Sequence, residues 1–310
     1  MSILENSIIV LHQILIMFLL MVVGYILFKT GIFDNHTTTH LSTLLNTIVI
    51  PCCVLASFNR DFDPALAGTL GLTMLSACGV FVVSIALSNA LYRKGHPENY
   101  RDCRMCAVFS NNGFMSLPLL SAMFGETGVF LGSAHIVVMA VVLWTYGVMQ
   151  VNRDYRFSPM RILLNPGIIA AVLGMLLFLS PVNLPTDVAS ALTHITNLNT
   201  PLAMLVLGGY LAQTNLASCF TEARIWRVGA VRLLVIPALT MALLYFMPLD
   251  NTAKLTLLVG TSAPTAIASA MFAQMYGSDY LYSTKVVALT TILSLVTLPA
   301  VIAAMSFLLA

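Results

Sequence analysis

Long apolar stretches, separated by short polar or turn segments, recur along the whole chain. The apolar windows have centres near residues 18, 50, 80, 115, 138, 172, 202, 238, 264 and 295. Each is about twenty residues long, which is enough for a helix to cross a hydrocarbon core of about 30 Å. The pattern predicts an all-α polytopic membrane protein with ten transmembrane helices.

The composition agrees with this pattern, because 59% of the 310 residues are hydrophobic and only 8% are charged. A water-soluble surface cannot be built from so few charges. The first stretch, near Ser7 to Phe28, follows Glu5 and no basic residue, so we interpret it as a retained span and not as a signal peptide. The loops are short, so no soluble domain is expected, and the net charge of +2 gives no indication of a nucleic-acid partner.

The basic residues are distributed unequally between the two sides of the predicted spans. One side holds Lys29, Arg93, Lys94, Arg101, Arg104, Arg153, Arg156, Arg161, Arg224, Arg227, Arg232 and Lys285. The other side holds Arg60 and Lys254. Because basic loops stay in the cytoplasm, we expect both termini on the extracytoplasmic side of the plasma (cell inner) membrane.

Helix-breaking residues recur with a fixed spacing, which suggests an internal repeat. Pro51 and Pro201 both lie within predicted spans, 150 positions apart. The same shift aligns Arg104 with Lys254, and "SNNGFMSLP" with "GTSAPTAIA". Each half would hold five spans, and an odd number places the second half upside down. The sequence therefore predicts a 5+5 inverted repeat, the architecture of many secondary transporters.

Spans four and nine contain poor helix formers at the expected depth of the bilayer. Span four contains Asn111, Asn112 and Gly113, followed by Pro118, and span nine contains Ser262, Pro264 and Thr265. Backbone freed by such residues costs several kcal/mol per group in hydrocarbon unless it is satisfied. Paired breaks in equivalent spans indicate a transporter's binding site, where half-helix N-termini and amides suit an anion. We therefore predict that the first three residues of span four and the three of span nine bind substrate.

The alternative is that these residues have only local structural roles. Asn112 would then cap a half-helix, Pro118 would kink it, and Ser262 and Thr265 would bond to their own helix. Matching breaks in both halves favour the binding site. Pro118, Pro51 and Pro201 are predicted to be helix breaks or hinges.

Several blocks of sequence resemble the auxin efflux carrier family in its compact prokaryotic form. They are "VIPCCVLASF", "NNGFMSLPLL", "NPGIIAAVLG", "TPLAMLVLGGYLA", "APTAIASAMFAQMYG" and "LTTILSLVTLP", in the expected order over nearly the whole chain. The resemblance implies a carrier for auxin-like or malonate-like carboxylates. It also implies that broken helices 4 and 9 cross at the midplane and that an asparagine, here Asn111 with Asn112 beside it, binds the carboxylate. Two departures are "SAPTAIASA" in span nine and Lys285 in span ten, which leave the substrate open.

The same resemblance implies two domains and an elevator-type mechanism. A scaffold of helices 1, 2, 6 and 7 would cover residues 1–60 and 161–218. It would form a homodimer through helices 2 and 7. A mobile transport domain of helices 3–5 and 8–10 would cover residues 61–160 and 219–310.

The candidates for a coupling group are histidines, because only histidine titrates near neutrality without perturbation. His135 in span five is favoured over His12 and His194, although a neutral hydrogen-bonded role is the alternative. No Asp or Glu lies at a span centre, so transport without a coupling ion is also open. Cys103 and Cys106 form a CxxC without further ligands nearby, and we expect no metal, no cofactor and no disulfide framework.

Three classes of function are compatible with a polytopic membrane protein. A carrier for a small organic anion accounts for the paired breaks. A membrane sensor with the same fold would bind the ligand without moving it. An intramembrane enzyme would need paired catalytic groups at span depth, and no such pair has motif-like spacing.

Overall fold

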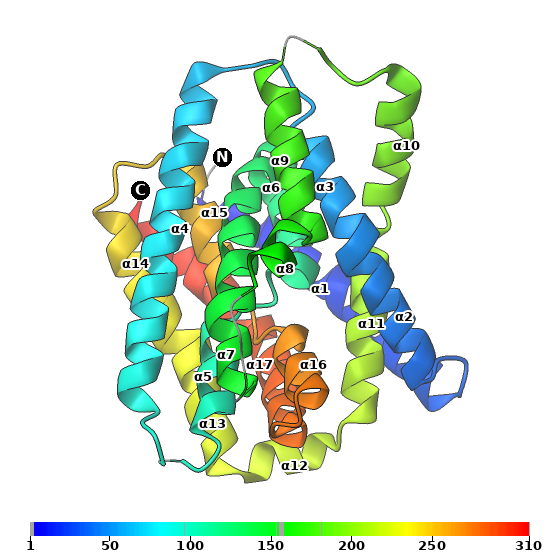
Figure 1. Cartoon of the computed structure of the whole chain (residues 1–310), viewed down its shortest axis with the longest axis vertical. Coiled ribbons are helices and arrows are strands. Elements are labelled where there is room, and N and C mark those ends of the chain that lie inside the picture. Colours follow the sequence, from blue (N-terminus) through cyan, green and yellow to red (C-terminus); the bar gives the residue numbers. More distant parts are fainter. Residues whose placement is uncertain (1–2, 96, 153, 155–157, 181, 310) are drawn as a thin grey trace.

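The structure is a computed structural model that describes residues 3–95, 97–152, 154, 158–180 and 182–309, with side chains from Val10 onward. All regular elements in these residues are helices (Figure 1). An isolated antiparallel bridge joins Ser110 to Thr265. The charged residues Arg153 and Arg156, which the sequence places with the basic loops, lie outside the described residues.

The chain divides into many helical segments, several of which are halves of longer helices. The first part contains α1 (Ile3–Lys29), α2 (Asn35–Leu44), α3 (Ile50–Ser57), α4 (Pro64–Leu91), α5 (Tyr100–Val108), α6 (Leu117–Val142) and α7 (Val148–Val151). The second part contains α8 (Pro159–Leu163), α9 (Pro166–Leu179), α10 (Thr186–Thr196), α11 (Asn199–Gln213), α12 (Leu216–Thr221), α13 (Ala223–Ala230), α14 (Ile236–Tyr245), α15 (Asn251–Ser262), α16 (Ile267–Met275) and α17 (Tyr280–Leu308). Widened π-helical turns occur at η1 (Leu45–Val49), η2 (Asn112–Ser116), η3 (Leu143–Gly147) and η4 (Val231–Val235).

Among the described residues, six helical stretches are long and apolar enough to cross a membrane. They are Val10–Lys29, Asn35–Ser57, Pro64–Leu91, Asn112–Val151, Ala223–Tyr245 and Tyr280–Leu308. The polytopic helical class is thereby confirmed, whereas the number of ten crossings stays a prediction. The stretch Asn112–Val151 has 40 residues and includes Gly125, whose φ of 58° and ψ of −143° are not helical. It therefore covers two of the expected spans. Other expected spans are divided into helices too short to be among the six stretches.

Prolines explain three of the π-helical turns. Pro51, Pro118 and Pro237 each stand at the second position of the helix that follows such a turn. Proline has no N–H to donate to the carbonyl four residues back, so the helix locally widens. The residue before each proline instead donates to the carbonyl five residues back, as Ile50 does to Leu45.

Pro201 has a different effect, because it stands at the third position of α11. Its missing N–H leaves the carbonyl of Asn197 without an intrahelical donor. The helical structure is interrupted just before it, between the end of α10 at Thr196 and the start of α11 at Asn199. Pro51 and Pro201 therefore differ in local structure, although the repeat aligns them.

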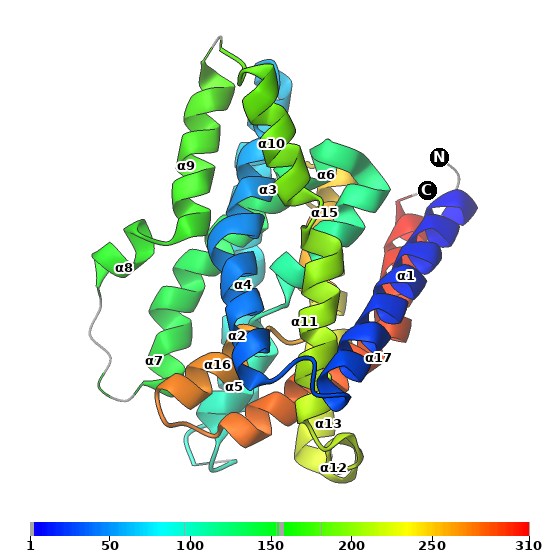
Figure 2. The same cartoon turned by 90° about the vertical axis from the view of Figure 1, so that its right-hand side faces the viewer.

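α1 and α11 pack closely side by side, as both cartoon views allow one to follow (Figures 1 and 2). Gly24 and Gly208 make this possible, since a Cβ on Gly208 would collide with the carbonyl oxygen of Met21. A Cβ on Gly24 would likewise collide with the carbonyl of Leu205. Small residues at such crossings let helix backbones approach within a membrane.

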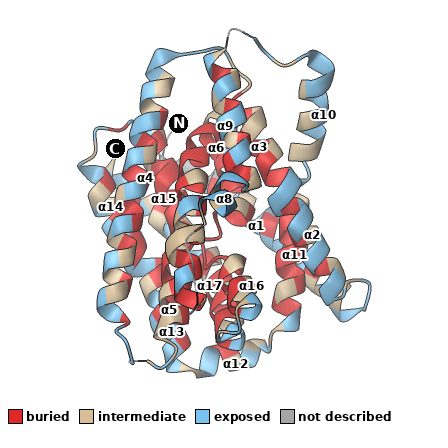
Figure 3. Cartoon of the chain, viewed as in Figure 1, coloured by how far each residue is buried: buried red, intermediate tan, exposed pale blue. Residues whose placement is uncertain are grey.

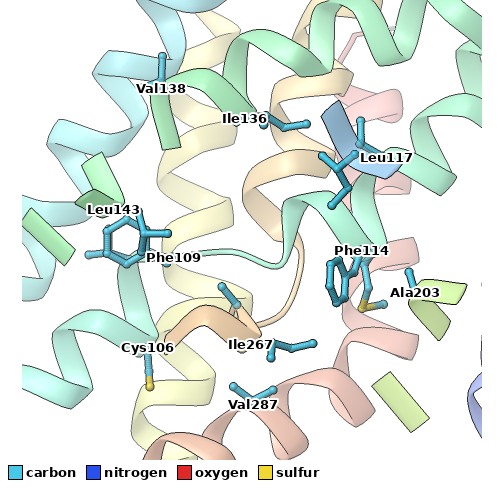
Figure 4. Packing of buried hydrophobic residues seen from close by; sticks show 14 of the residues in the cluster. Cys106, Phe109, Phe114, Leu117, Ile136, Val138, Leu143, Ala203, Ile267 and Val287 are labelled. Atoms are coloured by element: carbon cyan, nitrogen blue, oxygen red, sulfur yellow. The ribbon is translucent and has the colours of Figure 1, made fainter. Parts of the chain in front are cut away.

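The buried residues lie around the centre of the molecule, while outer helices such as α9, α10 and α4 expose much of their surface (Figure 3). One large apolar cluster surrounds the interruptions of α5–α6 and α15–α16. Phe109 and Phe114 belong to the first interruption and Ile267 to the second, with Ala203 of α11 and Val287 of α17 in the same core (Figure 4). The core thus fixes the position of the two interruptions.

Candidate functional site

The two predicted breaks exist and are bonded to each other. α5 ends at Val108, and α15 ends at Ser262. The N–H of Asn111 donates to the carbonyl of Pro264 at 2.7 Å, and the N–H of Ala266 donates to the carbonyl of Phe109 at 2.9 Å. Each interruption therefore provides hydrogen-bond partners for backbone groups of the other. These bonds offset the free-energy cost of unwinding two helices in an apolar environment.

The site is closed from solvent in this conformation. Asn111 is 5% exposed and Asn112, Ser262 and Thr265 are 1% or less. Gly113 lies against α3, because a Cβ there would stand 2.6 Å from the Cδ1 of Ile50. The expectation that the breaks face a pocket stays a prediction.

His135 connects the two interruptions. Its Nδ1 lies 2.7 Å from Nδ2 of Asn112, and its Nε2 lies 3.4 Å from Oγ1 of Thr261. The Thr261 hydroxyl already donates to the carbonyl of Leu257, so it accepts from Nε2–H. Nδ1 is then the acceptor for the Asn112 amide, which defines a neutral ring with its proton on Nε2.

Gly260 leaves the room that this arrangement needs. A Cβ at that position would stand 3.3 Å from Cγ of His135 and 3.4 Å from Oδ1 of Asn112. Phe81 of α4 covers the ring, with the two ring centroids 5.1 Å apart. His135 is thus held between α4, the first interruption and α15.

Arg232 of η4 is a site residue that the sequence reasoning missed. Its side chain is 1% exposed, and its Nε donates to the carbonyl of Ala263 at 3.1 Å. Its Nη1 donates to the carbonyls of Ala107 and Val108 at 3.0 and 3.2 Å. These carbonyls belong to the last turn of α5 and to the residue after α15, so one guanidinium ties two helix C-termini together, where the helix dipole favours a cation.

The position of Arg232 in an apolar run could have revealed it. Because it follows Arg224 and Arg227 closely, the sequence places it with the basic cytoplasmic loops. In the structure its side chain is buried inside the protein. An ionisable residue within a span indicates a functional site by default. The excess of basic residues on the predicted cytoplasmic side remains large without it.

Several polar atoms near the two interruptions are buried and lack a hydrogen-bond partner among the described residues. They are Asn111 Nδ2, Asn112 Oδ1, Ser262 Oγ and Arg232 Nη2. Buried polar groups are rarely left unpaired, and an unpaired donor invites an acceptor from a ligand. Thr265 differs, because its hydroxyl donates to the carbonyl of Cys106 at 2.9 Å and its N–H to the hydroxyl of Thr290 at 3.1 Å.

The remaining predicted residues have mainly structural surroundings. Pro264 contributes its carbonyl to the contact between the interruptions, and Pro118 begins α6 after a π-helical turn. Pro51 in α3 and Pro201 in α11 lie outside the two interruptions. Cys103 and Cys106 are buried free thiols, and Sγ of Cys103 lies 3.4 Å from the Tyr282 hydroxyl.

The sequence profile of a family described as "Membrane transport protein" matches residues 9–302. The chain belongs to this family. The resemblance to auxin efflux carriers is thereby confirmed, and the protein is a transporter, not an enzyme. As a membrane transporter it sits in the lipid bilayer and handles a substrate.

Two relatives extend over nearly the whole length. An uncharacterized transporter of Methanothermobacter thermautotrophicus is 24% identical over 297 residues, covering 93% of this chain and 96% of its own. An uncharacterized transporter of Methanocaldococcus jannaschii is 24% identical over 298 residues, covering 91% of this chain and 94% of its own. Neither name states a substrate.

Proposed function

We propose that this transporter is a secondary carrier for a small organic anion bearing a carboxylate, auxin-like or malonate-like, in the plasma (cell inner) membrane. The observation that carries the proposal is the Arg232 guanidinium, buried against carbonyl groups with one nitrogen left unpartnered. The ion pairs of the described residues are those of Arg60 with Glu126 and of Lys285 with Glu222, so Arg232 has no carboxylate there. A buried cation without a counter-charge is costly, and an anionic substrate would supply that charge.

The substrate-binding residues in this proposal are those of both interruptions. Asn111, with its free Nδ2, donates to the carboxylate, and Ser262 adds a hydroxyl donor. Asn112, Gly113, Pro264 and Thr265 shape the site by the contacts described above. The charge-assisted hydrogen bonds of such donors are stronger than neutral ones.

We further propose ten crossings in a 5+5 inverted repeat, with helices 4 and 9 crossing at the midplane. Each predicted span centre falls in a helix, in a π-helical turn or in an interruption, which supports the count. The start of α1 and the end of α17 lie near each other in the upper half of the molecule as drawn in Figure 2, as an even number of crossings requires. Loops α4–α5 and α12–α13 lie together at the opposite end (Figure 1), in keeping with extracytoplasmic termini.

Movement in this proposal is of the elevator type, with alternating access. The closest helix pairs, such as α1 with α11 and α16 with α17, fall within one of two groups, α1–α3 with α9–α11 and α4–α7 with α12–α17, which supports a scaffold and a transport domain. α6 and α17 also contact the first group and would form the boundary between the two domains. The scaffold would form the homodimer through helices 2 and 7. The closed site agrees with a carrier that must move to release its substrate.

Counterflow in proteoliposomes tests the proposal. Purified protein should exchange a labelled carboxylate from a panel of acetate, malonate, succinate and indole-3-acetate. Asn111→Ala should lower the rate roughly tenfold to a hundredfold, since a hydrogen bond to a charged group is worth about 1.5–3 kcal/mol. Asn112→Ala should also lower it, and Asn46→Ala, an exposed asparagine of η1, is the matched control.

A sensor that keeps the fold without transport is the second candidate, because the site is closed in this conformation. Saturable binding of a carboxylate with no counterflow would support it and reject the carrier. Transport by both asparagine variants at the parent rate would reject the site.

A further inference from the structure

A cavity of about 670 Å³ lies at the basic end of the molecule, lined by residues other than those of the crossing. It is lined by Leu91 and Tyr92 at the end of α4, Pro97 in the following loop, Cys103 of α5, Arg224, Arg227 and Ala230 of α13, and Val231 of η4. Helix ends meet there, which is where a membrane helix leaves the hydrocarbon. The proposed transport function does not use this cavity.

The lining combines an apolar wall with two cations. Leu91, Pro97, Ala230 and Val231 supply the apolar part, and Arg224 and Arg227 supply the charge. Both arginine side chains are exposed, and neither forms an ion pair among the described residues. The combination suits a ligand with an anionic head and an apolar body.

A buried donor is present at the same wall. Tyr92 is 7% exposed, and its hydroxyl has no hydrogen-bond partner among the described residues. Its backbone carbonyl accepts from Nε of Arg104 at 2.8 Å, which brings a third guanidinium close to this end of α4. Buried hydroxyls are seldom left unpaired, so a partner from outside the chain is expected.

Acidic side chains near this end have other partners or lie away from the lining. Glu222 pairs with Lys285, Asp102 accepts from Ser278, and Asp279 accepts from Asn99. Glu98 follows Pro97, and the lining includes no acidic residue. The charged side chains of the lining itself are therefore all positive.

The position of the cavity at the membrane boundary indicates which kind of anion it binds. Trp226, on α13 between the two arginines, is 41% exposed, and indoles gather at the headgroup level. Basic pockets between transmembrane helices at a cytoplasmic surface bind anionic lipid headgroups. We infer that this cavity binds the phosphate headgroup of an anionic phospholipid, with Arg224, Arg227 and Tyr92 as its ligands and the apolar wall against its chains.

Thermal unfolding in mixed micelles tests the inference. Parent protein in a neutral detergent is titrated with phosphatidylglycerol, phosphatidylcholine or inorganic phosphate at about 0.3 M salt, where exposed charges are largely screened. Phosphatidylglycerol should raise the unfolding temperature in a saturable way, since binding to the folded state stabilises it. The other two should not.

Variants locate the effect. Arg224→Gln with Arg227→Gln should weaken the apparent affinity for phosphatidylglycerol roughly tenfold, and Tyr92→Phe roughly threefold. The control, Arg93→Gln with Lys94→Gln, removes two charges from the same end but not from the lining.

Three results would overturn the inference. An equal shift with phosphatidylcholine would make the effect one of lipid in general. A shift with inorganic phosphate alone would indicate a site for a soluble anion. Equal affinities for the cavity variants and the control would show that the lining is not the site.

Discussion

The hydrogen bond between Asn112 and His135 couples the protonation state of the histidine ring to the hydrogen-bond donors that the asparagine amide has free. In the neutral ring, Nδ1 accepts from Nδ2 of Asn112, so this amide donor is occupied. A protonated ring donates from both nitrogens. Asn112 must then turn its amide, offering Oδ1 to the ring and releasing Nδ2 toward the crossing. Protonation therefore adds a positive charge and frees a donor, and both changes favour an anion.

We predict that transport of a carboxylate is accelerated by acid through His135. Because the ring is buried, the initial rate for the parent should rise mainly as the pH is lowered below about 6.5, the pKa of an unperturbed histidine. His135→Gln, which cannot titrate, should give a flat profile in the same liposomes, with a substrate ionised throughout.

His194→Gln is the matched control, because that histidine is exposed and belongs to α10, which packs against α3. Its pH profile should follow that of the parent. Parallel pH profiles for the parent and His135→Gln would show that His135 does not cause the pH dependence of transport.

Arg232 should contribute to stability as well as to substrate binding. Arg232→Gln removes three charge-assisted hydrogen bonds to the ends of α5 and α15, so we expect a loss of about 2–4 kcal/mol in the free energy of unfolding. Arg232→Lys restores the charge but not the planar fork, and should recover only part. Denaturant unfolding in detergent measures both, and an unchanged midpoint for the glutamine variant would refute the role.

At the scale of the helices, much of the fold could be predicted from the sequence. The apolar windows locate the helices, and the poor helix formers after Phe109 and before Ile267 locate both interruptions. The pairing of the interruptions follows from hydrogen-bond satisfaction only once they are known to meet. The bond from Asn112 to His135, and the side-chain contacts of Arg232, depend on packing between distant helices, which periodicity does not encode.

A proline within a predicted span can also have more than one effect on the local helix structure. Pro51 accompanies a widened turn within a continuous helix and Pro118 one in the first turn after an interruption, whereas Pro201 lies just after an interruption without a widened turn. The residues around Pro201 include Asn197 and Asn199, which favour caps and turns over helix interiors. Composition near a proline therefore matters as much as the proline itself.

The close packing of α1 against α11 gives a prediction for helix association. Gly208→Ala places a methyl group against the backbone of α1, which cannot move as a side chain can. We expect a loss of roughly 1–3 kcal/mol, as for overpacked sites, visible as a lower apparent unfolding temperature. Gly68→Ala in α4 is the control, because a Cβ there meets nothing within 4 Å. Equal behaviour of the two variants would show that α1 and α11 tolerate separation.

At the scale of the whole molecule, the two bonded interruptions lie beside the boundary between the two proposed domains. Gly113, in the first interruption, contacts Ile50 of α3, which belongs to the proposed scaffold. If one domain slides past the other during transport, this contact must break in each cycle. A covalent bond across it would then stop the cycle without removing the binding groups.

We therefore predict that Ile50→Cys with Gly113→Cys, placed in a background without the six native cysteines, loses counterflow on oxidation and regains it on reduction. A Cβ built on Gly113 lies 3.6 and 4.0 Å from Cγ1 and Cγ2 of Ile50, the two atoms bonded to the Ile50 Cβ, so a disulfide or a short crosslinker can join the two positions. The control uses the same background with Cys53 of α3 restored and joins it to Thr196→Cys of α10. Both lie in the proposed scaffold, so their bond should leave counterflow intact. Unchanged counterflow in the first crosslinked protein would exclude relative movement of the domains at this contact.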